Sequence, residues 1–164
     1  MGQTRHPVLC QCKQRKGEDM TGLTDEQRVD IVKYRIENAL NTLSEVKSHR
    51  DNGFYNTAVN RMYYACYYAA RALLTAYHNE AKTHEGVRQQ LGLNFVLTGK
   101  ISQEQGRFYS RLFSKRTTGD YDDFINHTAE TVDELYPQAQ SFVETIEGLL
   151  NVWFDEQRPP TPEP

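Results

Sequence analysis

Residues 54–77 read FYNTAVNRMYYACYYAARALLTAY, and this stretch decides the fold of the chain. If it forms an α-helix, which turns by about 100° per residue, apolar side chains cover about two-thirds of its circumference. A stripe of small residues runs along that apolar surface: Ala58, Ala65, Ala69, Ala72 and Ala76. Because alanine lets a neighbouring helix approach closely, the pattern predicts the central helix of a bundle.

The rest of the chain also favours helices. All six prolines lie outside residues 8–136, and proline breaks the interior of a helix. No stretch alternates between apolar and polar residues as a half-buried strand does. Periodicity and capping residues predict four further helices, over residues 24–50, 85–98, 103–116 and 128–155. We therefore expect an all-α fold.

Several residues predict where these helices begin, end or bend. Thr24 and Gln27 fit a capping box at the start of the first helix. Gly99 should close the third helix, since glycine is common just past a helix end. We expect residues 117–119 to separate the fourth helix from the fifth, and Pro137 to bend the fifth.

The composition excludes several classes of protein. With 164 residues the chain has the size of one domain, and 25% of its residues are charged. No apolar run approaches the roughly 18 residues that span a bilayer, and the N-terminal region lacks the apolar core of a signal peptide. Three cysteines cannot form a disulfide framework, which is typical of the reducing cytoplasm. We therefore expect a cytoplasmic protein that does not bind a membrane.

Composition divides the chain into three segments. Residues 1–19 are polar, basic and unpatterned, and we expect an extended or disordered arm there. Met20 follows this arm directly and could be the true start of the protein. Residues 20–156 form the helical domain, and residues 157–164 a proline-rich disordered tail.

The sequence contains no pattern typical of a metal or cofactor site. Cys10 and Cys12 lie close together, but no second cysteine pair completes a zinc site. The carboxylates Asp120, Asp122 and Asp123 lack the glycine-containing spacing of a calcium loop. Paired Glu-x-x-His motifs and glycine-rich phosphate loops are also absent. We therefore expect neither a metal ion nor a cofactor.

One narrow arc of the helix over residues 54–77 is polar, with a composition unusual for a solvated surface. It carries arginine, tyrosine and histidine rather than Lys and Glu: Arg61, Tyr64, Tyr68, Arg71, Thr75 and His78. Guanidinium groups bind phosphate in a planar fork, and tyrosine rings stack on bases. The candidate nucleotide-binding residues are therefore Arg61, Tyr64, Tyr68 and Arg71. Tyr and Arg are also enriched at helix–helix and dimer interfaces, so an interface is the alternative.

Charge is unevenly distributed along the chain, whose net charge is −3. Residues 84–116 contain six Lys or Arg against two acids, whereas residues 120–158 contain ten acids against one Arg. The basic stretch could face an anion. Alternatively, the two stretches form ion pairs with each other across a pair of helices.

Five short segments occur in one order along the chain. They are AVNRMYYACYYAARALL (residues 58–74), His84-Glu85-Gly86, FVLTGKI (residues 95–101), Arg107-Phe108-Tyr109, and Arg116 followed by Asp120-Tyr121. Together they resemble the HEPN family of prokaryotic helical domains, in particular its branch with an Arg-x3-Asp-Tyr ending. The resemblance covers about residues 24–150. It implies an up-and-down bundle of about five helices, which commonly dimerises and is often encoded beside a small nucleotidyltransferase in a toxin–antitoxin pair.

The resemblance also implies candidate catalytic residues. Family members that cleave RNA are similar in an Arg-x(4–6)-His motif, whose arginine would hold the phosphate while the histidine moves a proton at a dimer cleft. This sequence departs from that motif, because Asp120 and Tyr121 follow Arg116 where the histidine is expected. The candidates are therefore Arg116, Asp120, Tyr121 and His84, which matches the family's histidine before the third helix. His84 could instead cap that helix or bond a neighbouring loop.

Three functions remain open at this point. The first is a non-catalytic HEPN-like protein that binds a nucleotide or RNA and is the partner of a small nucleotidyltransferase in a toxin–antitoxin-type system. The second is a metal-independent endoribonuclease toxin that acts at the cleft of a homodimer. The third is a structural dimerisation module. We do not expect DNA as a ligand.

Overall fold

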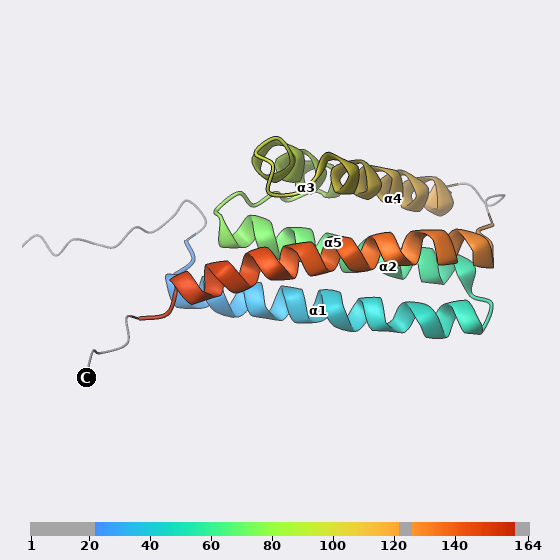
Figure 1. The fold of residues 1–164 in the computed structure, drawn as a ribbon, viewed down its shortest axis with the longest axis horizontal. Coiled ribbons are helices and arrows are strands. Elements are labelled where there is room, and N and C mark those ends of the chain that lie inside the picture. The colour runs from blue at the N-terminus through green and yellow to red at the C-terminus, as the bar shows by residue number, and fades with distance from the viewer. Residues whose placement is uncertain (1–21, 122–125, 160–164) are drawn as a thin grey trace, which may run out of the picture.

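The fold is a bundle of antiparallel helices. The structure, a computed structural model, describes residues 22–121 and 126–159, with no side chains described for residues 116–121. Its elements are α1 (Asp25–Asp51), α2 (Tyr55–Ala76), α3 (His84–Leu91), the short π-helix η1 (Gly92–Val96), α4 (Gln103–Tyr121) and α5 (Ala129–Glu156). The four long helices run alternately up and down, and α3 is seen nearly end-on beside α4 (Figure 1). The predicted all-α, up-and-down bundle of five helices is confirmed.

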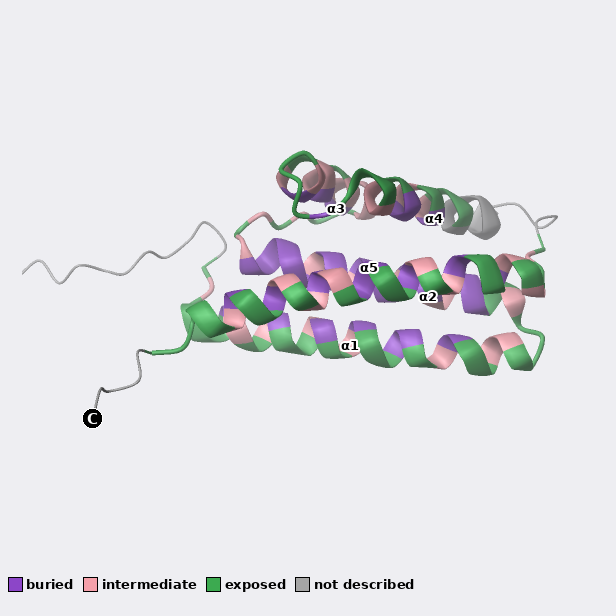
Figure 2. Cartoon of the chain, viewed as in Figure 1, coloured by how far each residue is buried: buried purple, intermediate pink, exposed green. Residues whose placement is uncertain are grey.

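Helix α2 lies at the centre of this bundle, as its alanine stripe predicts. It contacts α1, α3, α4 and α5. Every alanine of the stripe is at most 2% exposed: Ala58, Ala65, Ala69, Ala72 and Ala76. Figure 2 shows buried residues of α1 on the side that this helix turns toward its neighbours. The small side chains of α2 therefore lie in the core, where they permit close helix packing.

Two predicted helix boundaries are confirmed. Thr24 Oγ1 accepts the Gln27 N–H (3.2 Å) and Gln27 Oε1 accepts the Thr24 N–H (3.0 Å), which completes the capping box. Gly99 ends the turn after η1 with a φ of +77°, in the left-handed region that glycine adopts without steric cost. Helix α5 continues through Pro137.

Two other boundaries differ from the prediction. The helix expected over residues 85–98 widens at Gly92 into η1, where the Leu97 N–H donates to the carbonyl of Gly92, five residues earlier (3.0 Å). Residues 117–119 do not interrupt α4, which continues to Tyr121. Threonine and glycine each lower helix propensity by about 1 kcal/mol or less, which is too little by itself to end a helix.

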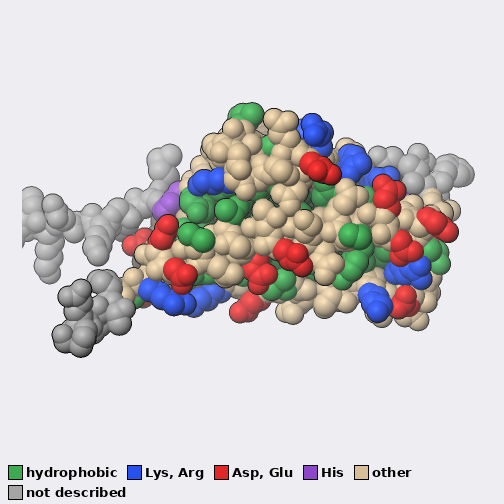
Figure 3. Space-filling view, viewed as in Figure 1, with side chains coloured by type: hydrophobic (Ala, Val, Ile, Leu, Met, Phe, Trp, Pro, Cys, Tyr) green, Lys and Arg blue, Asp and Glu red, His purple; other side chains and the backbone are tan. Residues whose placement is uncertain are grey.

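The two oppositely charged stretches lie largely on α4 and α5. Acidic side chains are visible along α5 and basic ones over α4 (Figure 3). Among the side chains that the structure describes, no ion pair joins these two helices. Asp133 of α5 instead pairs with Arg50 of α1, at 2.6 Å. In residues 22–121 and 126–159, no helix has the length and apolar character that crossing a membrane requires.

Candidate functional site

Two tyrosines of α2 hold His84, the first residue of α3, in a fixed orientation. The Tyr63 hydroxyl lies 2.7 Å from His84 Nδ1. The Tyr67 ring stacks on the imidazole with 4.2 Å between centroids and 15° between planes. Tyr63 and Tyr67 are buried, whereas His84 is half-buried. The imidazole is therefore positioned by a hydrogen bond and a ring stack while part of it stays accessible.

His84 does not cap α3, although the sequence allowed that role; its neighbour Thr83 does. Thr83 is the N-cap of α3, and its Oγ1 accepts the Gly86 N–H at 2.9 Å. The side chain of His84 instead reaches across to α2, 21 residues away in sequence from its partner Tyr63. A neutral imidazole has one donor and one acceptor nitrogen, and a tyrosine hydroxyl can donate or accept, so the role of Nε2 depends on which group donates in this hydrogen bond.

Two of the four candidate nucleotide-binding residues belong to the same aromatic cluster. Tyr64 meets the His84 ring edge-on, with 6.1 Å between centroids. Tyr68 lies 5.9 Å from Tyr64 and 6.0 Å from Tyr67, again between ring centroids. Both tyrosines are half-buried. We call Tyr63, Tyr64, Tyr67, Tyr68 and His84 the His84 cluster.

The two candidate arginines of α2 point to different neighbours. Arg61 forms an ion pair with Glu45 of α1, with 3.0 Å between Nε and Oε2. The Arg71 guanidinium lies over the Tyr67 ring, 5.8 Å from its centroid. Because ten residues of helix separate them, the two arginines are about 15 Å apart along α2. The structure therefore joins Arg71 to the edge of the His84 cluster and directs Arg61 toward α1.

The remaining candidate catalytic residues lie at the end of α4. The backbone of Arg116, Asp120 and Tyr121 belongs to that helix, but their side chains lie outside the described part of the structure. Phe113, one turn before Arg116, contacts the Tyr63 ring at 6.1 Å between centroids. Helix α4 thus passes beside the His84 cluster just before this segment.

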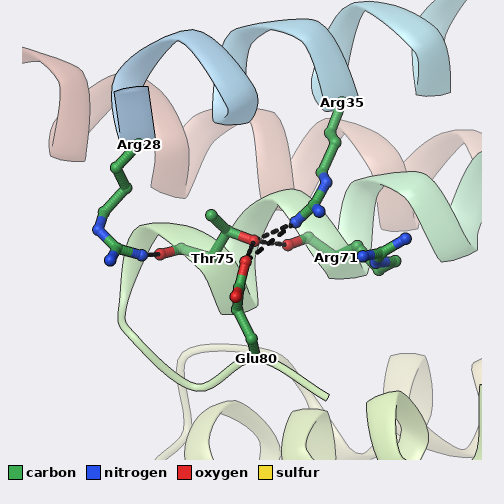
Figure 4. Close-up of polar contacts among 5 residues, drawn as sticks. All are labelled: Arg28, Arg35, Arg71, Thr75 and Glu80. Carbon is green, nitrogen blue, oxygen red and sulfur yellow. Dashed lines mark hydrogen bonds and ion pairs between the residues drawn. The ribbon is translucent and has the colours of Figure 1, made fainter. Parts of the chain in front are cut away.

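A network of arginines around Thr75 was not predicted from the sequence (Figure 4). Arg28, only 2% exposed, donates to the Thr75 carbonyl oxygen at 2.7 Å, and Arg35 donates to Thr75 Oγ1. The same hydroxyl lies 2.8 Å from Glu80 Oε1. The spacing of residues along α1 could have indicated these arginines, because positions 28 and 35 lie on the helix face that buries Val32, Ile36 and Ala39.

Burial shifts the pKa values of Arg35 and Cys66 in opposite directions. Burial, followed by the positive charge of Arg71, lowers the pKa of Arg35, and Glu80 offsets part of the effect. Burial raises the pKa of the Cys66 thiol, so this cysteine stays a neutral thiol rather than a reactive thiolate. In the part of the chain that the structure describes, no three His, Cys, Asp or Glu side chains gather as metal ligands. Cys10 and Cys12 lie outside the described residues.

Comparison with known proteins identifies the family. A family model described as HEPN domain matches residues 32–149. A UPF0332 protein of Thermotoga maritima is 36% identical over 124 residues, which are 76% of this chain and 94% of that protein. Two proteins of Methanocaldococcus jannaschii, "Putative toxin MJ0605" and "Putative toxin MJ0142", are 32% and 29% identical, over 80% and 70% of this chain and 97% and 78% of their own lengths. Since the family match spans most of the bundle, the chain belongs to the HEPN domain family.

Proposed function

We propose that the protein is a toxin-type HEPN protein that binds RNA through the His84 cluster. The observation that carries the proposal is the imidazole of His84, oriented by Tyr63 and stacked on Tyr67 while still partly accessible. The names of the two M. jannaschii relatives support a toxin-type role.

The chemistry of the cluster fits single-stranded RNA. Proteins recognise unpaired bases by stacking them on aromatic rings, and Tyr64 and Tyr68 are half-buried rings at the rim of the cluster. The imidazole of His84 can form a hydrogen bond with a phosphate oxygen or a ribose 2′-hydroxyl. Because only RNA carries the 2′-hydroxyl, the site should bind RNA in preference to DNA.

The proposal includes two partners that the family resemblance suggests. One is a second copy of the chain, which would place two His84 clusters in one assembly. The other is a small nucleotidyltransferase that restrains the toxin. Light scattering of the purified protein tests the second copy, and a monomer would contradict it. Growth assays with and without a co-expressed nucleotidyltransferase from the neighbouring gene test the other partner, and toxicity that the nucleotidyltransferase does not restrain would contradict it.

Fluorescence anisotropy with a labelled single-stranded RNA tests the binding. Base stacking on one aromatic ring is worth about 1–3 kcal/mol, so Tyr68→Leu should weaken binding by about tenfold. Tyr34→Leu is the matched control, because Tyr34 is a 65% exposed tyrosine on α1. Equal losses for the two variants, or equal affinity for RNA and DNA, would contradict a specific site.

Cleavage of RNA is a second candidate function, favoured by the hydrogen bond between Tyr63 and His84. If the Nδ1–H of His84 donates its hydrogen bond to the Tyr63 hydroxyl oxygen, Nε2 is the unprotonated nitrogen and can take the proton of a 2′-hydroxyl as that oxygen attacks the adjacent phosphorus. The bond between phosphorus and the 5′-oxygen then breaks, and the 5′-oxygen takes a proton from water, which yields a 2′,3′-cyclic phosphate and a 5′-hydroxyl. Arg116 is the candidate that stabilises the charge on the phosphate.

Incubation of the protein with RNA in a chelating buffer separates the two functions. Fragments with a cyclic phosphate, lost in His84→Gln and Arg116→Ala, would establish cleavage. Intact RNA that remains bound would leave the protein as a binding subunit. Circular dichroism of each variant would show that the bundle is folded in both experiments.

A further inference from the structure

A small basic cavity lies where α1, α2 and the segment after α2 meet. Its volume is about 200 Å³. Three cationic side chains, a hydroxyl and a carboxylate face it: Arg35, Arg71, Lys82, Thr75 and Glu80. Leu74 and Val87 form apolar parts of the wall. Figure 4 shows the Arg35 guanidinium and the Glu80 carboxylate converging on the Thr75 hydroxyl, whose other contact is the backbone carbonyl of Arg71, while the Arg71 side chain extends away.

The charges that line this cavity do not balance. Glu80 is the single acid against three cations in the lining. After burial, the positive charge of Arg71 is the next cause that lowers the pKa of Arg35. Neighbouring like charges destabilise each other, and a bound anion reduces that cost. The lining therefore carries more positive than negative charge, which favours an anion such as phosphate.

Glu80 holds the position that an external anion would take. Its carboxylate lies 2.8 Å from Thr75 Oγ1 and 3.4 Å from a guanidinium nitrogen of Arg35. It stands outside α2 and α3, in the segment between them, and its side chain is 27% exposed. A carboxylate on a connecting segment can swing outward, which would leave the hydroxyl and the guanidinium group for phosphate oxygens.

We propose that this cavity is a phosphate-binding site, which adjoins the His84 cluster because Arg71 lines the cavity and also lies over the Tyr67 ring. Pockets for whole small molecules occupy about 300–1,000 Å³, so a cavity of about 200 Å³ fits a phosphate group rather than an entire nucleotide. The ligand is therefore inorganic phosphate or the terminal phosphate of a nucleotide or an RNA. The site does not depend on the proposed RNA binding, because its recognition chemistry is confined to the phosphate.

Isothermal titration with inorganic phosphate, at constant ionic strength against chloride, tests this site. Wild-type protein should bind one phosphate per chain. Arg71→Gln should weaken binding by about tenfold or more, because a charge-assisted contact is lost. Glu80→Gln should strengthen it severalfold, because the internal competitor loses its charge. Lys33→Gln, which removes an exposed cation from the same helix as Arg35, should leave the affinity unchanged.

The opposite signs of these effects keep the test decisive. Absence of saturable binding, equal losses in Arg71→Gln and Lys33→Gln, or weaker binding by Glu80→Gln would each overturn the site. If Arg71→Gln does not fold, Lys82→Gln replaces it, since Lys82 is exposed on a connecting segment. Parallel titrations with uridine, uridine 5′-monophosphate and a 5′-phosphorylated RNA identify the source of the phosphate; binding of uridine as tight as that of its monophosphate would also overturn the site.

Discussion

The Tyr63 hydroxyl and the Nδ1 atom of His84 lie 2.7 Å apart and join the centre of α2 to the first residue of α3. The tyrosine is fully buried, and the histidine is half-buried. A hydrogen bond in this environment orients the imidazole and ties the start of α3 to α2. Structure and proposed chemistry therefore depend on the same contact.

Replacing Tyr63 by phenylalanine removes this hydrogen bond and keeps the ring. We expect the free energy of unfolding to fall by about 1–3 kcal/mol, because the imidazole nitrogen loses its partner in a partly buried site. RNA affinity or cleavage should fall as well. Urea unfolding measures the first effect, with Tyr34→Phe on the exposed side of α1 as the control. Unchanged stability in Tyr63→Phe would show that the contact contributes little.

Replacing Thr75 by valine tests the arginine network. Valine keeps the shape of threonine but cannot accept the hydrogen bond from Arg35 or bond Glu80. Because Thr75 is fully buried, we expect a loss of about 1–3 kcal/mol of unfolding free energy. Thr57→Val, an exposed position of the same helix, should change stability by a few tenths of a kcal/mol. Equal effects at both positions would contradict a role for the buried hydroxyl.

The sequence predicted the centre of the fold because its signal is a long and regular pattern. Five alanines repeat at helical spacing along α2, and all of them are buried. In contrast, the π-helical segment that begins at Gly92 is only five residues long. Over so short a segment, the pattern of apolar residues does not distinguish this wider turn from an α-helix with about 3.6 residues per turn. The end of α4 was also mispredicted, because the low helix propensity of Thr117, Thr118 and Gly119 does not by itself end the helix.

The candidate site was predictable in its residue types but not in its grouping. Tyr64, Tyr68 and His84 come together because α3 leaves the end of α2 and places its first residue back against that helix. Helical periodicity does not specify the direction that a connecting segment takes. Arg28 and Arg35 were missed for a different reason, since arginine on a helix is ordinarily read as solvent-exposed.

Glycines of α4 and α5 provide a paired test of packing. A Cβ atom at Gly106 would lie 2.9 Å from Val96 Cγ2 and 3.1 Å from Cγ1, whereas one at Gly148 would meet no atom within 4 Å. We expect Gly106→Ala to destabilise the protein by about 1–3 kcal/mol, because α4 must move away from η1. Gly148→Ala should stabilise it by about 0.5–1 kcal/mol through helix propensity. Adding Val96→Ala should restore part of the loss in Gly106→Ala; no recovery would contradict the proposed clash.

The ion pair between Arg50 and Asp133 predicts a dependence of stability on pH. Two hydrogen bonds from Arg50, at 2.9 and 2.6 Å, lower the pKa of the Asp133 carboxyl below its ordinary value. The folded state therefore favours the charged carboxylate. The contribution of this carboxylate to the free energy of unfolding is present above about pH 4 and is lost as the pH falls through the lowered pKa. NMR titration of Asp133 should give a midpoint below about 3.9 in the wild type and near that value in Arg50→Gln. Arg158→Gln, near the other end of α5, should not move the midpoint, and an equal shift in both variants would show that overall charge rather than this pair sets it.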